Sequence, residues 1–413
     1  MESSVLELEA DTSHSRLTPP QFDHPLPNLL ELSAAEILDS CRKSQARELT
    51  STLRQARAGE GGIAASIPIL RQYMAAYPAE SLALRQRLDA AALERLFLRM
   101  HDHVMTHPVW VHPFFVRICT GDISVEQLKR FSRHYFNQVK NTRQCVALAL
   151  GRFHTMVDRK DGELNVILSE LTQLVLAGLL ADEYGSHGHH EVEASADLQA
   201  VDIGTLFSPI THPELFRRFL HALGDSVRDY DAPMLHGVAD NVLVQRILSN
   251  HPAYGEQEAL ASVGLGMEWG VPAFFSMIMA GIIKVAAREG LDLDGRSMEI
   301  WSAHVRQDVA HAIAVMVATG FHVDDETDVA RIENATNILM AFRYDMMSDI
   351  YREVYGTPCA TVAEIGLERR YFLHDDRIVT LLAAERAKLR PGSVREPAQY
   401  AARHIGMPIV ASR

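Results

Sequence analysis

The segment that decides how this chain is built is WSAHVRQDVAHAIAVM, residues 301–316. Its apolar residues recur at helical spacing, so the segment is predicted to be a helix. On a helix that turns about 100° per residue, His304, Asp308 and His311 fall within an arc of about 60°, on one face over two turns. Apolar residues such as Ile300 lie on the same side, so this face is expected to point into the protein.

This inward face carries three side chains that commonly bind metal ions, in the pattern H-x-x-x-D-x-x-H. A buried charge without a partner costs several kcal/mol unless it is matched by another charge or bound to a metal. The pattern therefore indicates a metal site. A solvated polar face, or a His-Asp hydrogen bond buried for structural reasons, would also explain it.

Helical periodicity extends through most of the chain on both sides of this segment, whereas alternating strand patterns are almost absent. The sequence therefore predicts an all-α fold in which long helices pack as a bundle. The predicted helices lie near 124–156, 163–184, 212–225, 231–248, 256–289, 295–319, 327–354 and 376–388.

Two glutamates elsewhere have the same buried character. Glu268 lies on a helix face that is otherwise apolar, with Leu265 and Phe275 one and two turns away. Glu183 ends an apolar stripe that includes Leu176, just before the helix is expected to stop at a glycine. Both are candidate metal ligands. The alternative for each is a salt bridge to a neighbouring Arg, or an exposed helix end.

His212 opens a further predicted helix, THPELFRRFLHALG, residues 211–224. Taken alone, it is better explained as a bystander beside the capping residue Thr211. In a helical bundle, however, facing helices each supply one or two ligands to a shared metal site. A mixed set of carboxylates and imidazoles suits iron or manganese better than metals that prefer thiolates.

Composition limits the class of protein. The chain has 413 residues, 47% of them hydrophobic and 23% charged, which is typical of a globular protein. Its net charge of -13 argues against nucleic-acid binding, which depends on clustered Lys and Arg. A small-molecule substrate is the better expectation.

The expected location is the cytoplasm. The four cysteines are far apart and form no C-x-x-C pair, which argues against a zinc knuckle or a disulfide framework. Residues 1–28 lack the basic start and apolar run of a signal peptide, and no stretch of 18 consecutive apolar residues occurs. We therefore expect neither secretion nor a membrane span.

Taken together, these segments resemble the haem-oxygenase-like diiron oxidases and oxygenases, whose helical fold is shared with haem oxygenase and the thiaminase-like proteins. The resemblance covers roughly residues 105–355. The stretch HPVWVHPFFVRICTGDISVEQLKRFSRHYFNQV, residues 107–139, is similar to the first helices of that superfamily and indicates the fold only.

The diiron branch of the family adds a Glu followed two residues later by Gly, a His that opens a helix of the form H-P-x-L-F, a later Glu, and a final H-x-x-x-D-x-x-H. The resemblance implies two Fe(II) ions, with O2 as co-substrate and an external electron donor where one is needed. The ligands that it implies are Glu183, His212, Glu268, His304, Asp308 and His311.

The chain departs from the family pattern in two places. An enlarged His-rich loop separates Glu183 from His212, so that a His of the loop could replace His212; H-P-E-L-F favours His212. The family also usually has a carboxylate on the helix before Glu183, where this chain has none in a suitable place. The alternative ligands are His187, His189 and His190 in the loop, and Asn141, Gln144 and His154 on or near that helix.

Composition and periodicity, together with the resemblance over the central part, divide the chain into four parts: a flexible arm (1–30), an N-terminal helical segment (31–103), the haem-oxygenase-like diiron domain (104–356) and a C-terminal extension (357–413). Family members oxidise amino acids, fatty acids or similar molecules by N-oxygenation, desaturation or oxidative C–C cleavage, often in natural product biosynthesis. We expect a homodimer that acts on an amino-acid-derived substrate.

Two matters stay open at this stage. Arg143, Arg152 and Lys140 could bind the substrate's carboxylate, although a solvated helix face explains them better. The alternatives to a diiron enzyme are a cofactorless oxidase of the same fold, a thiaminase-like enzyme with Cys145 as nucleophile, or a metal-free binding module.

Overall fold

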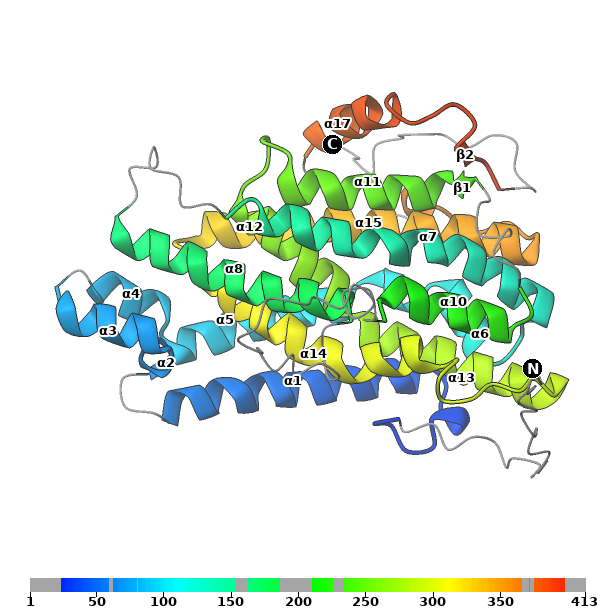
Figure 1. The fold of residues 1–413 in the computed structure, drawn as a ribbon, viewed down its shortest axis with the longest axis horizontal. Helices are drawn as coiled ribbons and strands as arrows, with labels where there is room; N and C mark the ends of the chain where they lie inside the picture. Colours follow the sequence, from blue (N-terminus) through cyan, green and yellow to red (C-terminus); the bar gives the residue numbers. More distant parts are fainter. Residues whose placement is uncertain are drawn as a thin grey trace, which may run out of the picture.

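The computed structural model has an almost wholly helical fold, which confirms the prediction of an all-α protein (Figure 1). The residues that it describes are 24–58, 62–79, 81–153, 162–185, 210–225, 233–365, 371 and 375–397.

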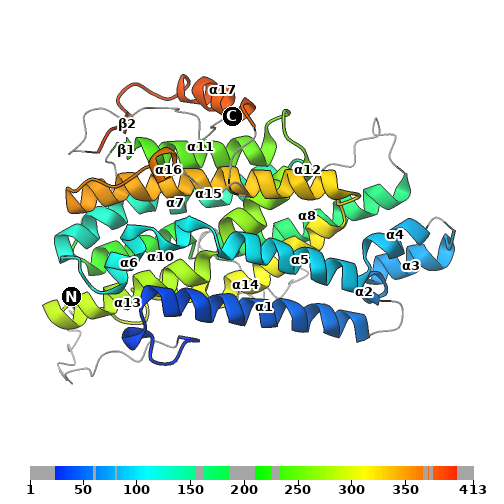
Figure 2. The ribbon, with the colours of Figure 1, turned by 180° about the vertical axis from the view of Figure 1, so that it is seen from behind.

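The N-terminal part consists of a short 3-10 turn and five helices. They are η1 (Leu29–Glu31), α1 (Ala34–Ala58), α2 (Gly62–Ser66), α3 (Pro68–Ala76), α4 (Ser81–Arg87) and α5 (Ala90–Met105). Figure 2 shows α1 running beside α5 and α13, and these helices are in contact. The side-chain amide of Gln45 on α1 donates a hydrogen bond to the Trp269 carbonyl, 2.5 Å away. This part of the chain is therefore packed directly against the helices that follow.

The central part holds the long helices, which run roughly along the longest axis of the molecule (Figure 1). Its elements are η2 (Pro108–Val111), α6 (Pro113–Cys119), α7 (Val125–Leu150), α8 (Glu163–Glu183), α10 (His212–Ala222), α11 (His236–Asn250), α12 (Glu256–Leu260), η4 (Ala261–Glu268), α13 (Val271–Glu289), α14 (Glu299–Gly320) and α15 (Glu326–Tyr355). Helix α11 packs on α7 and α15, and α13 packs on α6 and α14. One apolar core runs through all of these helices.

Local sequence signals set the ends of these helices. At the start of α7, Ser124 and Gln127 form a capping box: the Gln127 amide donates to Ser124 Oγ at 3.2 Å, and the Ser124 amide donates to Gln127 Oε1 at 2.9 Å. Helices α13 and α15 both end at a glycine with positive φ, Gly290 at 69° and Gly356 at 65°. The helix ends are therefore largely predictable from the sequence.

Residues 256–289, predicted as one helix, contain a change of helix type instead. The π-helical segment η4 lies between α12 and α13, and the Trp269 amide donates to the Gly264 carbonyl, five residues earlier. Two glycines in η4 allow neighbouring helices to approach closely: a Cβ on Gly264 would overlap Val315, and one on Gly266 would overlap Leu339. Such π-helical turns occur often at functional sites.

The C-terminal part of the described chain lies against α11. It contains α16 (Val362–Ile365), α17 (Arg377–Arg386) and the short strand β2 (Val394–Arg395), which pairs in parallel with β1 (Met234–Leu235). An ion pair between Arg386 on α17 and Asp240 on α11 joins the two helices. The two strands were not predicted, because two-residue segments carry no alternating pattern.

Two helical stretches are long and apolar enough to cross a membrane by length and composition alone: Glu163–Glu183 and Glu256–Glu289. The second is 83% buried inside the protein, as is usual for a core helix, whereas the first is only 33% buried. Most of the outward side of α8 is apolar; Leu174, for example, is 69% exposed.

Candidate metal centre

The structure brings all six predicted ligand side chains together, in two groups of three. In each group, one nitrogen or oxygen atom of every member lies within 4.8 Å of the others. Four elements supply them: the end of α8, the start of α10, the end of η4, and α14. The first group consists of Glu183, His212 and His304, and the second of Glu268, Asp308 and His311.

In the first group, two imidazoles and a carboxylate face one another. Nδ1 of His212 lies 3.1 Å from Oε1 of Glu183, and the His212 and His304 rings are 4.4 Å apart. Nδ1 of His304 donates to the Ile300 carbonyl at 2.7 Å, which leaves its Nε2 lone pair available to a metal. Burial, together with the neighbouring His212, lowers the pKa of His304 to about 3. Near neutral pH this imidazole is therefore in the uncharged form that binds metals.

The neighbouring histidines favour the ionised form of Glu183. Burial raises the pKa of this carboxyl group, but His212, His304 and His311 outweigh burial, and the pKa is lower than usual. Glu183 is therefore ionised near neutral pH.

The second group has the opposite electrostatic character. Burial and the charge of Glu183 raise the pKa of Glu268 to about 8, although Arg343 opposes this rise. Burial, Glu268 and Glu183 raise the pKa of Asp308 well above its usual value. Oδ2 of Asp308 is fully buried and has no hydrogen-bond partner among the described residues. This group therefore has too little positive charge nearby for its carboxylates.

These residues fit a pair of divalent cations. A cation would satisfy the buried Asp308 oxygen and remove the repulsion between the carboxylates of the two groups. The donors are oxygen and imidazole nitrogen only, a set that suits iron or manganese.

Asp182 is a further carboxylate of the site, and the sequence analysis did not single it out. Its Oδ2 lies 2.5 Å from Nε2 of His311, and its side chain is 4% exposed. The other ring nitrogen of His311, Nδ1, lies 3.9 Å from Oδ1 of Asp308. A carboxylate paired with one ring nitrogen fixes which nitrogen a metal can use. Asp182 therefore orients His311 toward the second group.

A cavity of about 40 Å³ lies beside the ligands. It is lined by five of the six, all except His311, and by Tyr135, Gln138, Val139, Thr142, Met267, Val271, Phe274, Phe275 and Arg343. Most of these additional side chains are apolar or aromatic. They give the site a largely water-excluding wall.

Asn141 and Gln144, the two alternative ligands on α7, are not part of the cavity wall. Asn141 donates a hydrogen bond to the Asn137 carbonyl at 2.6 Å, and Gln144 is exposed. Gln138 and Thr142 of the same helix line the cavity instead. His154, His187, His189 and His190 lie outside the described residues.

The three basic side chains considered as carboxylate partners also lie outside the cavity wall. Arg143 lies over the Tyr184 ring, and Lys140 lies 5.5 Å from the centre of the Phe136 ring. Arg152 donates to a backbone carbonyl at the end of α11.

Cys145 does not have the surroundings of an activated thiol. It is completely buried, and burial raises its pKa to about 12. A nucleophilic cysteine needs the opposite shift, since only the thiolate attacks. Its nearest polar group is the side-chain oxygen of Gln245, 3.7 Å from Sγ.

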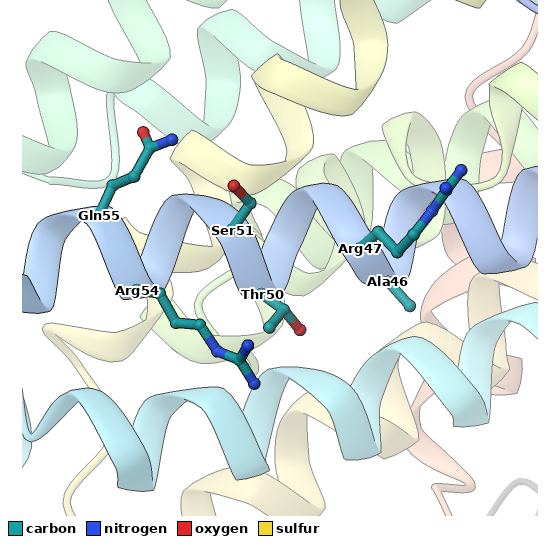
Figure 3. Close-up of a pocket in the computed structure, with 6 residues that line it drawn as sticks. All are labelled: Ala46, Arg47, Thr50, Ser51, Arg54 and Gln55. Atoms are coloured by element: carbon teal, nitrogen blue, oxygen red, sulfur yellow. The ribbon is translucent and has the colours of Figure 1, made fainter.

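A larger hollow lies on the surface along α1 (Figure 3). Among the described residues, those that line it belong to α1, and none of these is a carboxylate, His or Cys. The residues of the hollow are Ala46, Arg47, Thr50, Ser51, Arg54 and Gln55.

No family model matches this chain, and no curated protein is significantly similar to it.

Proposed function

We propose that this protein is a non-haem diiron oxidase or oxygenase that uses O2 to oxidise a small, amino-acid-derived molecule. In this proposal, residues 104–356 form a haem-oxygenase-like bundle, and the two groups of three ligands each hold one Fe(II) ion. The observation that carries the proposal is the meeting of six donors from four separate elements, four of them buried and two, His304 and His311, half-buried. When bound, the irons would supply the redox chemistry that activates dioxygen.

The protein's own residues contribute donors in the required protonation states. His304 is neutral, and its Nε2 is free to bind because its Nδ1 is committed to a backbone carbonyl. Glu183 is ionised. Glu268 and Asp308, whose pKa values are raised, would lose their protons when a cation binds their carboxylate oxygens. Metal binding is therefore coupled to loss of protons from the second group.

The cavity wall contributes exclusion of water. Four apolar side chains border the ligands and cannot bind water strongly. They are Met267, Val271, Phe274 and Phe275. A dry site strengthens electrostatic interactions and protects reactive species from side reactions.

The surroundings of Cys145 weigh against a thiaminase-like enzyme, which would need an activated thiol. A metal-free binding module would leave the buried Asp308 oxygen without a partner among the described residues, at a cost to stability.

Iron binding under anaerobic conditions, followed by exposure to O2, tests the proposal. We expect the wild-type protein to bind close to two Fe(II) ions per chain and to change its visible absorption when O2 is added. His311→Ala should bind less iron and lose the change. His221→Ala is the matched control, because His221 lies on α10 but belongs to neither group. Absence of iron binding by the wild-type protein would refute the proposal.

A further inference from the structure

Arg343 is a buried cation that lies near the candidate ligand Glu268 and is itself no metal ligand. It lies on α15, is 5% exposed and lines the same cavity as the candidate ligands. Its Nη1 is fully buried without a hydrogen-bond partner, and Arg343 forms no ion pair within the described part of the chain. A buried guanidinium without an anion costs several kcal/mol, so its retention here calls for a ligand.

Two aromatic side chains pack near the guanidinium of Arg343. Its central carbon lies 5.9 Å from the centre of the Trp110 ring and 5.7 Å from that of the Phe274 ring. Such rings stabilise a cation without using its N–H donors. The N–H groups of Arg343 therefore remain available to an acceptor in the cavity.

Charge balance shows what kind of acceptor is needed. Two divalent cations carry four positive charges, and Asp182, Glu183, Glu268 and Asp308 supply four negative ones. The positive charge of Arg343 then has no counterpart among these groups. One additional anion would neutralise the loaded site.

We propose that Arg343 binds the carboxylate group of the substrate, which makes the substrate an organic acid held with its charged end at α15. This inference rests on the proposed diiron function. A guanidinium presents two parallel N–H donors that match a carboxylate, and the pairing is strong where water is excluded. The single unbalanced positive charge matches a carboxylate better than a phosphate ester, which carries close to two negative charges near neutral pH. The rest of the substrate then extends toward the metal ligands that share the cavity.

The test uses full-length protein loaded with Zn(II), which requires no turnover, and acetate as the probe. Acetamide, which has nearly the same shape but no charge, is the matched control ligand. Trp110 borders Arg343, so tryptophan fluorescence reports occupancy, and calorimetry gives the dissociation constant. The proteins are wild type, Arg343→Gln, Arg343→Lys and, as a control, Arg217→Gln on the outer side of α10, whose side chain is 40% exposed.

We expect wild type and Arg217→Gln to prefer acetate to acetamide. Arg343→Gln should bind acetate more weakly by on the order of tenfold or more, with acetamide binding unchanged, because a charge-assisted pair is lost. Arg343→Lys should lie between them, because it keeps the charge but loses the paired donors. Circular dichroism and metal content establish that each variant is folded and loaded.

Equal acetate affinity in wild type and Arg343→Gln would overturn the inference and would indicate that the probe binds the metals alone. Equal affinity of the wild type for acetate and acetamide would also overturn it, even if no Arg343 variant folds. If the wild-type protein still takes up metal, either of these two results would contradict the role of Arg343 without contradicting the proposed function. Absence of metal uptake by the wild type overturns both.

Discussion

Glu268→Gln should stabilise the metal-free protein near neutral pH and reduce the stabilisation that metal provides. Glu268 is buried, and its pKa of about 8 is well above the usual 4.5. The folded protein therefore keeps a proton on this carboxyl group over a pH range in which the unfolded chain has lost it. Glutamine has the same shape as the protonated acid and cannot ionise.

The sign and size of the effect follow from the two pKa values. Below pH 4.5 the acid is protonated in both states and has no effect; between pH 4.5 and about 8 the wild-type protein loses stability as pH rises. Each pH unit costs about 1.4 kcal/mol, so the loss at pH 7 is on the order of 3 kcal/mol. Asp308 adds to the loss in the same direction, because its pKa is also raised.

Urea unfolding of chelator-treated protein at pH 5, 6, 7 and 8, followed by circular dichroism, measures the effect. The difference between variant and wild type should increase with pH. Adding Zn(II) should stabilise the wild type more than the variant, because the wild type binds the metal more tightly.

Glu258→Gln is the matched control, since Glu258 is equally buried but pairs with Arg331 at 2.7 Å. Although burial raises the pKa of Glu258, this partner lowers it below its usual value overall. Its charge therefore stabilises the fold above pH 4.5, and this contribution is lost as pH falls. Glu258→Gln should destabilise the protein at pH 7 with or without metal. If Glu268→Gln also destabilises the metal-free protein at pH 7, our account of the second group is wrong.

Two further predictions concern positioning and packing. Asp182→Asn removes the charge that orients His311. It should weaken the binding of one metal by roughly 10- to 100-fold, measured by competition with a chelator. Unchanged affinity for both metals would contradict this role of Asp182. Gly281→Ala should lower the free energy of unfolding in urea by roughly 1–3 kcal/mol, because the added methyl group would overlap the Ile118 carbonyl oxygen. Gly178→Ala on α8, where the methyl group meets open space, should be neutral or slightly stabilising, and an equal loss in both variants would refute the packing argument.

The local features of the fold could be predicted from the sequence. Helical periodicity gave α7, α8, α14 and α15 to within a few residues at most ends, and the Ser124 capping box was visible in the letters alone. The shared face of His304, Asp308 and His311 was also predictable. These features depend on residues within two or three turns of each other, where helix geometry relates sequence spacing directly to position.

The prediction that Glu183, His212 and Glu268 join that face came from a resemblance, because no local rule states which helices meet. The fold brings them together, but it also places two further side chains at the site, Asp182 and Arg343, which the sequence did not single out. Asp182 directly precedes Glu183 on α8. Glu183 belongs to the first group of ligands, yet Asp182 contacts His311 of the second group. Arg343 had no distinguishing pattern within its long helix.

The sequence by itself determined the helices, their buried faces and the ligand-type residues on those faces. Tertiary structure alone decided that η4 is a π-helix, that Asp182 reaches His311, and that Arg343 lines the cavity without an ion pair to any described residue. The physical reason is the range of the interactions. Helix formation depends on neighbours along the chain, whereas burial, charge compensation and pKa depend on side chains brought together from distant helices.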